Sequence, residues 1–461
     1  MSNLATSQNP VRAAIVGSGP SGFYAAEALL ASEQTVLVDM FERLPSPFGL
    51  VRSGVAPDHP KLKQPIRVYQ QIAESPRFRF LGNVTVGRDL SVEELKGCYH
   101  VVVFACGAET DRTLGISGEH LAGSHAATEF VGWYNGHPDY RDLVFDLSHE
   151  TAVVIGQGNV AVDVCRILCK TADELRHTDI AGYALEILAQ SRIRDVYMIG
   201  RRGPAQAKFT HPELRELGEL ADCDPILAPH DLELNRASRE ELADRRNRAI
   251  SKSYEVLQAF TARPAPTRHR RCHIQFLKSP TELKGEKKLE RVVLARNRLE
   301  GEPSRQVACE TGEVEELACG VLFRSIGYRG VAIPGVPFDD HRGVFPNQDG
   351  RIVDGQNVVP GLYVTGWIKR GPTGIIGTNR EDSVATVNSL LADLPNLPAG
   401  PKTGADGLIA LLQSRAVRVV SYADWQKIDA AEVRRGETAG KPREKFARVE
   451  EMLEVLGVCR T

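Results

Sequence analysis

The chain has 461 residues and a formal net charge of −2, and its length allows two or three domains. Hydrophobic residues make up 42% and charged residues 25%, which is typical of a globular protein. The near-neutral charge gives no bulk reason to bind nucleic acid, and no segment approaches the roughly 20 apolar residues that span a bilayer.

The N-terminus and the cysteines limit the possible functions further. The first ten residues form a polar tail without the apolar core of a signal peptide, so we expect a cytoplasmic protein. The nine cysteines include no C-x-x-C pair, which argues against a disulfide scaffold, a thiol–disulfide centre, a zinc site and a cysteine-bound cluster. Cys165 and Cys169 are spaced i, i+4 on an expected helix, and we interpret them as packing residues. No metal site is predicted.

The first recognisable unit is a strand, a glycine-rich turn and a helix. A buried strand over 11–16 precedes G-S-G-P-S-G, which contains Gly17, Gly19 and Gly22. Such glycines permit a tight turn, a close approach to a pyrophosphate and packing of helix on strand. The next strand, over 34–42, ends in Glu42, at the spacing where a carboxylate accepts hydrogen bonds from ribose hydroxyls. This unit therefore predicts a dinucleotide with free ribose hydroxyls.

The same pattern restarts after residue 150. A strand over 151–155 leads into G-Q-G-N-V-A, beginning at Gly156, and its partner strand over 196–199 is followed by Arg201 and Arg202. A carboxylate would repel a ribose 2′-phosphate, whereas the guanidinium group offers a charged, rigid fork of donors. The second unit therefore predicts NADP(H).

Further buried strands are expected over 99–106, 321–326 and 362–366, and a strand pair over 273–277 and 291–296. Two strand–glycine–helix units in one chain predict an α/β fold with two doubly wound, Rossmann-like domains. Residues from about 401 onward are expected to form a connector and amphipathic helices.

Two dinucleotide sites in one chain suggest an electron relay. NADPH gives up two electrons as a hydride, whereas iron–sulfur and haem acceptors take one at a time. A flavin bridges this difference, so we assign the first glycine loop to FAD.

Five sequence blocks resemble the adrenodoxin-reductase-type ferredoxin–NADP⁺ reductases. They are G-S-G-P-S-G-F-Y-A-A, L-P-x-P-F-G-L-V-R-S-G-V-A-P-D-H-P, G-Q-G-N-V-A-x-D, G-R-R-G-P-x-Q-A-x-F-T and G-W-I-K-R-G-P-T-G-I-I-G-T-N. The resemblance implies a glutathione-reductase-like architecture with a polar tail (1–10), a discontinuous FAD domain (11–106 and 326–461, with a C-terminal helical segment) and an inserted NADP domain (107–325). Because no mitochondrial targeting segment is evident, the bacterial branch is expected.

The resemblance also implies which residues bind the cofactors. For FAD, besides Gly17, Gly19 and Gly22, they are Ser21, Glu42, Leu50, Val86, Trp367, Gly374, Ile375 and Ile376. For NADP(H), besides Gly156, they are Gln157, Gly158, Asn159, Val160, Arg201, Arg202, Glu213 and Gly374. The helix expected to begin near Asn379 would direct its positive N-terminal end at the flavin.

His59, in A-P-D-H-P, is the candidate polar group near the flavin, with Glu216 as its companion. Hydride transfer needs no acid or base, so their role would be to position groups, tune the potential or deliver a proton. A histidine that fixes a proline-rich loop is the alternative interpretation of His59.

The expected function is hydride transfer from NADPH to FAD, followed by one-electron transfers to a ferredoxin or a similar small acidic carrier. The docking surface could include Arg245, Arg246, Arg248, Arg268, Arg270 and Arg271, although such a stretch is commonly a solvated face. An NADPH-dependent flavin monooxygenase, a diaphorase or quinone reductase, and a nucleotide-bound sensor remain alternatives. The absent C-x-x-C disfavours a disulfide reductase.

Overall fold

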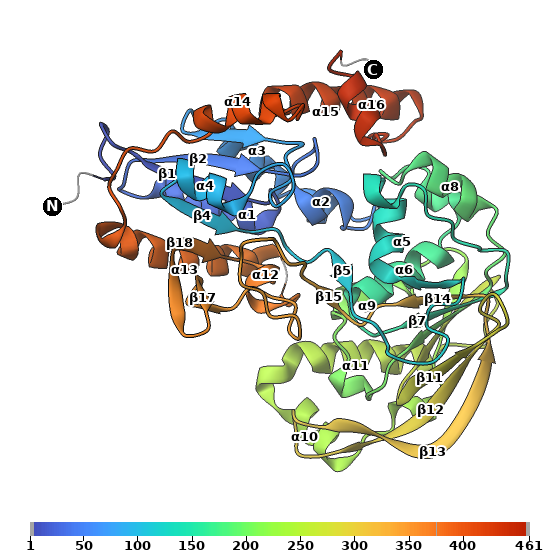
Figure 1. The fold of residues 1–461 in the computed structure, drawn as a ribbon. Coiled ribbons are helices and arrows are strands. Elements are labelled where there is room, and N and C mark those ends of the chain that lie inside the picture. Colours follow the sequence, from blue (N-terminus) through green and yellow to red (C-terminus); the bar gives the residue numbers. More distant parts are fainter. Residues whose placement is uncertain (1–3, 375, 458–461) are drawn as a thin grey trace. The chain divides into compact units, whose positions relative to one another are not determined.

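Figure 1 shows the fold of the computed structural model, which describes residues 4–374 and 376–457. The chain divides into two compact units. The first consists of Met1–Thr110 and Tyr328–Thr461, and the second, Asp111–Gly327, is inserted between these two parts in the sequence.

The first unit is built on a seven-stranded sheet with the order β16-β17-β18-β4-β1-β2-β3. The strands from β18 to β3 are parallel, and β17 and β16 extend the sheet antiparallel. The strands are β1 (Val11–Val16), β2 (Val36–Phe41), β3 (Phe78–Leu81), β4 (Val101–Phe104), β16 (Asn347–Gln348), β17 (Arg351–Asp354) and β18 (Asn357–Val364).

Both faces of this sheet are covered, because successive side chains of a strand point to opposite sides. On β1, Ala13 and Ile15 join one apolar cluster, whereas Ala14 and Val16 join another. The first cluster includes α1 (Pro20–Ala31), α3 (Ile66–Ala73), α13 (Ile376–Asp393), α15 (Tyr422–Thr438) and α16 (Val449–Glu454). The second includes α4 (Val92–Cys98), α12 (Trp367–Arg370) and α14 (Asp406–Ser414). Burial on both faces explains the apolar run of β1 from Ala13 to Val16.

The second unit has a six-stranded, all-parallel sheet with the order β6-β14-β7-β8-β10-β9. Its strands are β6 (Ser124–Ala126), β7 (Thr151–Ile155), β8 (Asp195–Ile199), β9 (Cys223–Ile226), β10 (Arg270–Gln275) and β14 (Val321–Arg324). One face carries α5 (Ala127–Tyr134), α6 (Asn159–Cys169), α7 (Ala172–Leu175), α8 (Gly182–Ala189), α9 (His211–Glu216) and α11 (Arg248–Thr261).

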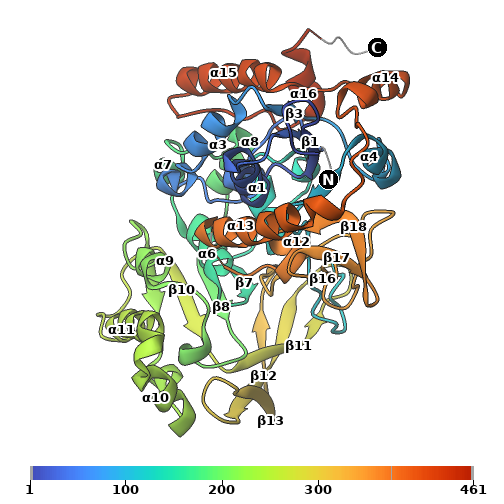
Figure 2. The same ribbon diagram turned by 90° about the vertical axis from the view of Figure 1, so that its left-hand side faces the viewer.

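A three-stranded antiparallel sheet covers the opposite face, where Leu283, Val292 and Leu294 pack on Val153 and Ile199. Figure 2 shows it below β7 and β8. Its strands are β11 (Lys278–Lys284), β12 (Arg291–Glu300) and β13 (Val307–Ala318). The second unit thus has three layers: helices, a parallel sheet and an antiparallel sheet.

The parallel sheets confirm the predicted α/β fold with two doubly wound units. The predicted strand pair over 273–277 and 291–296 is wrong, because β10 pairs with β8 and β9, whereas β12 pairs with β11 and β13. The chain leaves the parallel sheet at Leu277, whose φ of 55° lies in the left-handed region. The glycine-block helix α13 begins at Ile376, three residues before the expected start. Every helix in the described residues is too short or too polar to cross a lipid bilayer.

Candidate functional site

The first glycine loop leaves open space where a pyrophosphate would approach. Gly17 has a φ of 106°, and a Cβ on it would lie 2.5 Å from the Ala105 carbonyl oxygen. A Cβ on Gly22 would lie 2.1 Å from the Gly17 carbonyl oxygen, whereas one on Gly19 would meet nothing within 4 Å. Gly17 and Gly22 therefore fix the shape of the loop, and Gly19 leaves room beside the N-terminus of α1, where main-chain amides favour an anion.

Glu42 lies directly after β2 and is hydrogen-bonded to this loop. Its Oε2 accepts hydrogen bonds from Ser18 N at 3.1 Å and Ser18 Oγ at 2.6 Å, and its Oε1 accepts one from Leu44 N at 3.2 Å. A carboxylate has about four lone-pair positions, so it can also accept from a ribose hydroxyl. The sequence indicated the ribose role, but the bonds that orient this carboxylate depend on the folded loop.

The segment after β18 approaches the first glycine loop closely. A Cβ on Gly366 would lie 2.2 Å from Ser21 Oγ, so only glycine fits there. Trp367 Nε1 is buried and has no hydrogen-bond partner among the residues that the structure describes. A buried donor without a partner costs free energy. A bound flavin dinucleotide, with its carbonyl, hydroxyl and phosphate oxygens, fits this unsatisfied donor.

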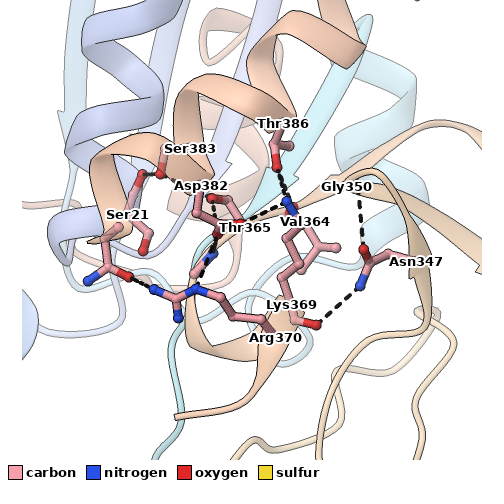
Figure 3. Close-up of polar contacts among 12 residues, drawn as sticks. Ser21, Asn347, Gly350, Val364, Thr365, Lys369, Arg370, Asp382, Ser383 and Thr386 are labelled. Carbon is pink, nitrogen blue, oxygen red and sulfur yellow. Dashed lines mark hydrogen bonds and ion pairs between the residues drawn. The ribbon is translucent and has the colours of Figure 1, made fainter. Parts of the chain in front are cut away.

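Asp382, on α13, holds the turn that follows Gly366, as Figure 3 shows. Its carboxylate accepts a hydrogen bond from Gly366 N at 2.6 Å and forms an ion pair with Lys369 at 2.8 Å. Arg370, which lies beside it, donates to Asn379 Oδ1 at 2.6 Å. Ser383 Oγ donates to the Ser21 carbonyl at 3.0 Å, which joins α13 to α1. These contacts bring the two ends of the sequence together around one site.

The remaining predicted residues of the first unit lie on different elements. Leu50 is on α2 (Gly49–Ser53) and is 36% exposed, whereas Val86 is buried. Gly374 has a φ of 85°, and Ile375 lies outside the described residues. His59 is half-buried and caps the 3₁₀ helix η1 (Pro60–Lys63). Ile376 is the first residue of α13.

The second glycine loop has the same design. Gly156 has a φ of 137°, and a Cβ there would lie 2.1 Å from the Ser325 carbonyl oxygen, whereas a Cβ on Gly158 would meet nothing within 4 Å. Gln157 Nε2 donates to the Gln275 carbonyl at 2.8 Å, and Asn159 Oδ1 accepts from Thr210 N at 2.8 Å. The open space again lies at the second glycine, at the start of α6.

Arg201 and Arg202 follow β8 in a turn, Arg201 exposed and Arg202 half-buried. Lys208 N and Phe209 N donate to the Gln157 carbonyl at 2.8 and 3.0 Å, so the segment after the arginines is bonded to the second glycine loop. The structure thus attaches the segment that follows the arginine turn to the second glycine loop; that the two arginines bind the ligand of this loop stays a prediction.

Glu213 and Glu216 share a cation that the sequence analysis missed. Arg166 on α6 is 1% exposed and forms ion pairs with Asp163 at 2.7 Å, Glu213 at 3.6 Å and Glu216 at 3.5 Å. An arginine within the apolar face of a predicted helix was the signal, because such a side chain needs charged partners. Glu216 lies in the second unit and His59 in the first. Their suggested companionship stays a prediction.

The arginines considered for docking divide into two groups. Arg270 Nη1 donates to the Cys169 and Lys170 carbonyls, and Arg271 forms an ion pair with Asp195 at 2.6 Å. The guanidinium of Arg268 likewise donates to a main-chain carbonyl of its own unit. These three serve the internal structure, whereas Arg245, Arg246 and Arg248 lie on the surface around the start of α11.

A chain with two glycine loops of this kind, each at the carboxyl end of a parallel sheet, defines a two-dinucleotide oxidoreductase. A family model for pyridine nucleotide-disulphide oxidoreductases matches residues 11–203. The chain is 48% identical to the NADPH-ferredoxin reductase FprA of Mycobacterium tuberculosis, over 97% of this chain and 99% of that protein. It is 46% identical to the mitochondrial NADPH:adrenodoxin oxidoreductase of Homo sapiens, over 99% of this chain and 94% of that protein.

The solved structure of Mycobacterium tuberculosis FprA in complex with NADPH superposes with a TM-score of 0.92 at 47% identity, and covers 97% of this chain and 99% of that one. The chain belongs to the adrenodoxin-reductase-type ferredoxin–NADP⁺ reductase family.

Proposed function

We propose that this chain is an NADPH-dependent ferredoxin reductase, with FAD in the first unit and NADP(H) in the second. One observation carries the proposal. Two glycine loops with the same open space are followed by opposite ribose-binding groups, Glu42 in one unit and Arg201 with Arg202 in the other. Relatives that are similar over nearly their whole length, and are named as NADPH-dependent reductases of ferredoxin or adrenodoxin, support it.

In the first unit, the amides at the start of α1 would bind the pyrophosphate of FAD, and Glu42 would accept hydrogen bonds from its ribose. The Trp367 indole N–H would donate to the cofactor, and Asp382 would hold the adjoining turn rigid through Gly366 and Lys369. Leu50, Val86, Gly374, Ile375 and Ile376 complete the proposed FAD contacts. When bound, the flavin accepts an electron pair as hydride and passes the electrons on singly.

In the second unit, the start of α6 would bind the pyrophosphate of NADP(H), with Gly158 leaving the space for it. The guanidinium groups of Arg201 and Arg202 would bind the 2′-phosphate and thereby favour NADPH over NADH. Gln157, Asn159 and Val160 would contact the same ligand. Glu213 and Glu216 would influence the NADP(H) site through Arg166, whose charge they partly neutralise.

His59 remains a proposed polar group near the flavin, held at the start of η1 by its own main chain. The main-chain N–H of His59 donates to the Ala56 carbonyl at 3.0 Å, and the main-chain carbonyl of His59 accepts from Leu62 N at 3.1 Å. These bonds restrain the main chain from which the imidazole projects. The electron acceptor would be a ferredoxin or a similar small acidic protein, attracted by arginines such as Arg245, Arg246 and Arg248.

The test is a spectrum followed by a turnover measurement. The purified protein should show flavin absorbance bands, which NADPH, but not NADH at the same concentration, should bleach under anaerobic conditions. A [2Fe–2S] ferredoxin should then be reduced at a rate that depends on both NADPH and the enzyme. A protein without flavin that cannot be reconstituted with FAD would overturn the proposal. NADPH oxidation that consumes oxygen and oxygenates an organic compound, without reduction of the ferredoxin, would favour the monooxygenase alternative.

A further inference from the structure

The turn that carries Arg201 and Arg202 is held by hydrogen bonds to the chain that leaves the parallel sheet. Gly200 N donates to the Gln275 carbonyl, and Lys278 N donates to the Gly200 carbonyl, both at 3.0 Å. Leu277 N donates to the Arg202 carbonyl at 3.1 Å. The main chain on either side of Arg201 is therefore bonded to the connection between β10 and β11.

The carbonyl of Arg201 itself is held by a side chain from a different strand. Asn297, on β12, donates from Nδ2 to the Arg201 carbonyl at 2.9 Å and to Ser279 Oγ at 2.8 Å. Its main-chain N–H donates to the Leu277 carbonyl at 2.7 Å. Because a carbonyl oxygen can only accept, the Arg201 contact also fixes which end of the amide faces the turn.

Asn297 lies where the pairing of β12 with β13 is irregular. Ala295 pairs with Val314 but Asn297 pairs with Glu310, so two residue steps on β12 stand opposite four on β13. The extra residues therefore lie on β13, and the regular ladder is locally disrupted. At the edge of this irregular stretch, the side chain of Asn297 forms its hydrogen bond to the turn after β8.

Packing alone does not account for an amide at this position. Asn297 is 3% exposed, and its Oδ1 has no hydrogen-bond partner among the described residues. Burying an amide with an unsatisfied oxygen costs free energy that an apolar side chain of similar size would not. What the amide adds here is a donor to the Arg201 carbonyl, which restricts the ψ angle of Arg201 and the direction in which its side chain leaves the turn.

We propose that Asn297 is a positioning residue for cofactor specificity: through the main chain of Arg201 it orients the Arg201 side chain toward the 2′-phosphate of NADP(H). This inference rests on the proposed function, because it requires that the second unit bind a 2′-phosphorylated dinucleotide. It also gives the three-stranded sheet a role beyond covering the parallel sheet, since β12 supplies the residue that holds the specificity turn.

The test compares the selectivity of the flavin-loaded enzyme for NADPH over NADH, given by the ratio of the two kcat/KM values with ferricyanide as electron acceptor. In Asn297→Ala, the KM for NADPH should rise about 3- to 10-fold, whereas kcat and the KM for NADH should stay within about twofold, since one neutral hydrogen bond is lost. The ratio does not depend on the amount of folded enzyme. The isosteric Asn297→Asp variant, whose ionised carboxylate cannot donate a hydrogen bond, should lower the selectivity ratio at least as much as Asn297→Ala does.

Two further variants separate positioning from general destabilisation. Ser279→Ala removes the other partner of the same Nδ2 but leaves the Arg201 contact, so its selectivity should stay within about twofold of wild type. In the Arg201→Ala, Asn297→Ala double variant, the loss of selectivity should equal that of Arg201→Ala alone, because Asn297 acts through Arg201.

Unchanged selectivity in both Asn297 variants, an equal rise of the two KM values, or additive losses in the double variant would overturn the inference. A wild-type enzyme without preference for NADPH would instead overturn the proposed NADP(H) site, and the inference with it.

Discussion

Replacement of Glu432 by glutamine should loosen the part of the first unit that contains α2. Glu432, on α15, is fully buried, and it bonds to Arg52 on α2 through two hydrogen bonds of 2.8 and 2.5 Å. The Arg52 guanidinium also lies 4.9 Å from the centre of the Trp425 ring, and Lys445 Nζ donates to the Arg52 carbonyl at 3.1 Å. The C-terminal helical segment therefore holds α2, which carries the proposed FAD contact Leu50.

The expected cost follows from the burial of both partners. Arg52 is 6% exposed and Glu432 is 0% exposed, so removing one charge leaves the other unpaired and desolvated, at a cost of about 3–5 kcal/mol. Glutamine retains one hydrogen-bond acceptor, so we expect the lower end of this range, about 3 kcal/mol. For a unit of this size, that corresponds to a midpoint of thermal unfolding lower by about 6–12 °C. Movement of α2 that exposes Arg52 to water should also release FAD earlier on heating.

The assay follows the fluorescence of released FAD during heating of the flavin-loaded protein, together with circular dichroism. Lys427→Gln is the matched control, because Lys427 is on the same helix but 64% exposed, and its ion pair with Asp424 should contribute less than about 1 kcal/mol. The Arg52→Met, Glu432→Leu double variant should unfold at a higher temperature than Glu432→Gln, since it leaves no buried unpaired charge. A Glu432→Gln midpoint within 2 °C of wild type, with unchanged FAD release, would refute the reasoning (about 2–4 °C corresponds to 1 kcal/mol).

The same pair predicts a pH dependence. Burial raises the pKa of Glu432, but the charge and hydrogen bonds of Arg52, together with the charge of Arg443 and the hydrogen bond from Phe446 N, outweigh it and hold this pKa below its ordinary value of 4.5. A carboxyl group whose pKa is lower in the folded than in the unfolded state stabilises the fold above the unfolded pKa, and this contribution is lost as the pH falls toward the folded pKa. The difference in midpoint between wild type and Glu432→Gln should therefore be constant from about pH 6 to 8 and narrow below about pH 4.5.

Four other variants test the cofactor sites and their supports. Arg201→Ala with Arg202→Ala should raise the KM for NADPH about 10- to 100-fold and leave that for NADH nearly unchanged in steady-state kinetics; equal losses with both would contradict the 2′-phosphate role. Gly19→Ala should fold normally but purify with less FAD, because its Cβ enters the open space proposed for the pyrophosphate. Gly17→Ala should instead lower the midpoint of thermal unfolding, because Gly17 has a φ of 106° and a Cβ there would contact Ala105. Comparable FAD content in wild type and Gly19→Ala would argue against the proposed FAD site. Arg166→Gln should lower the free energy of unfolding of the second unit by about 3–5 kcal/mol, measured by urea denaturation, and a loss below about 1 kcal/mol would show that its three carboxylates do not depend on it.

Local sequence was enough to propose where the cofactors bind. The glycine loops directly follow β1 and β7, and Glu42 and the arginine pair follow the next strand of each unit, so short-range spacing predicted these residues as ligand-binding groups. The buried central strands were predicted because strands buried on both faces are apolar runs, whereas more exposed strands such as β13 were not. Strand pairing was not predicted either: β10 and β12 lie close in sequence but belong to different sheets.

The supports of the site depended on tertiary structure. Arg52 and Glu432, which are hydrogen-bonded, are 380 residues apart in the sequence. Asn297 donates a hydrogen bond to Arg201 from another sheet, and Arg166 forms ion pairs with Glu213 and Glu216 on a second helix. The spacing of these residues along the chain does not predict such contacts. The physical reason is that a glycine's conformational freedom or a strand's apolar run acts locally, whereas a buried charge or amide is satisfied by whichever group the packing brings to it. The sequence alone thus predicted where the dinucleotides bind, and the packing of distant segments decided how firmly the predicted binding groups are held.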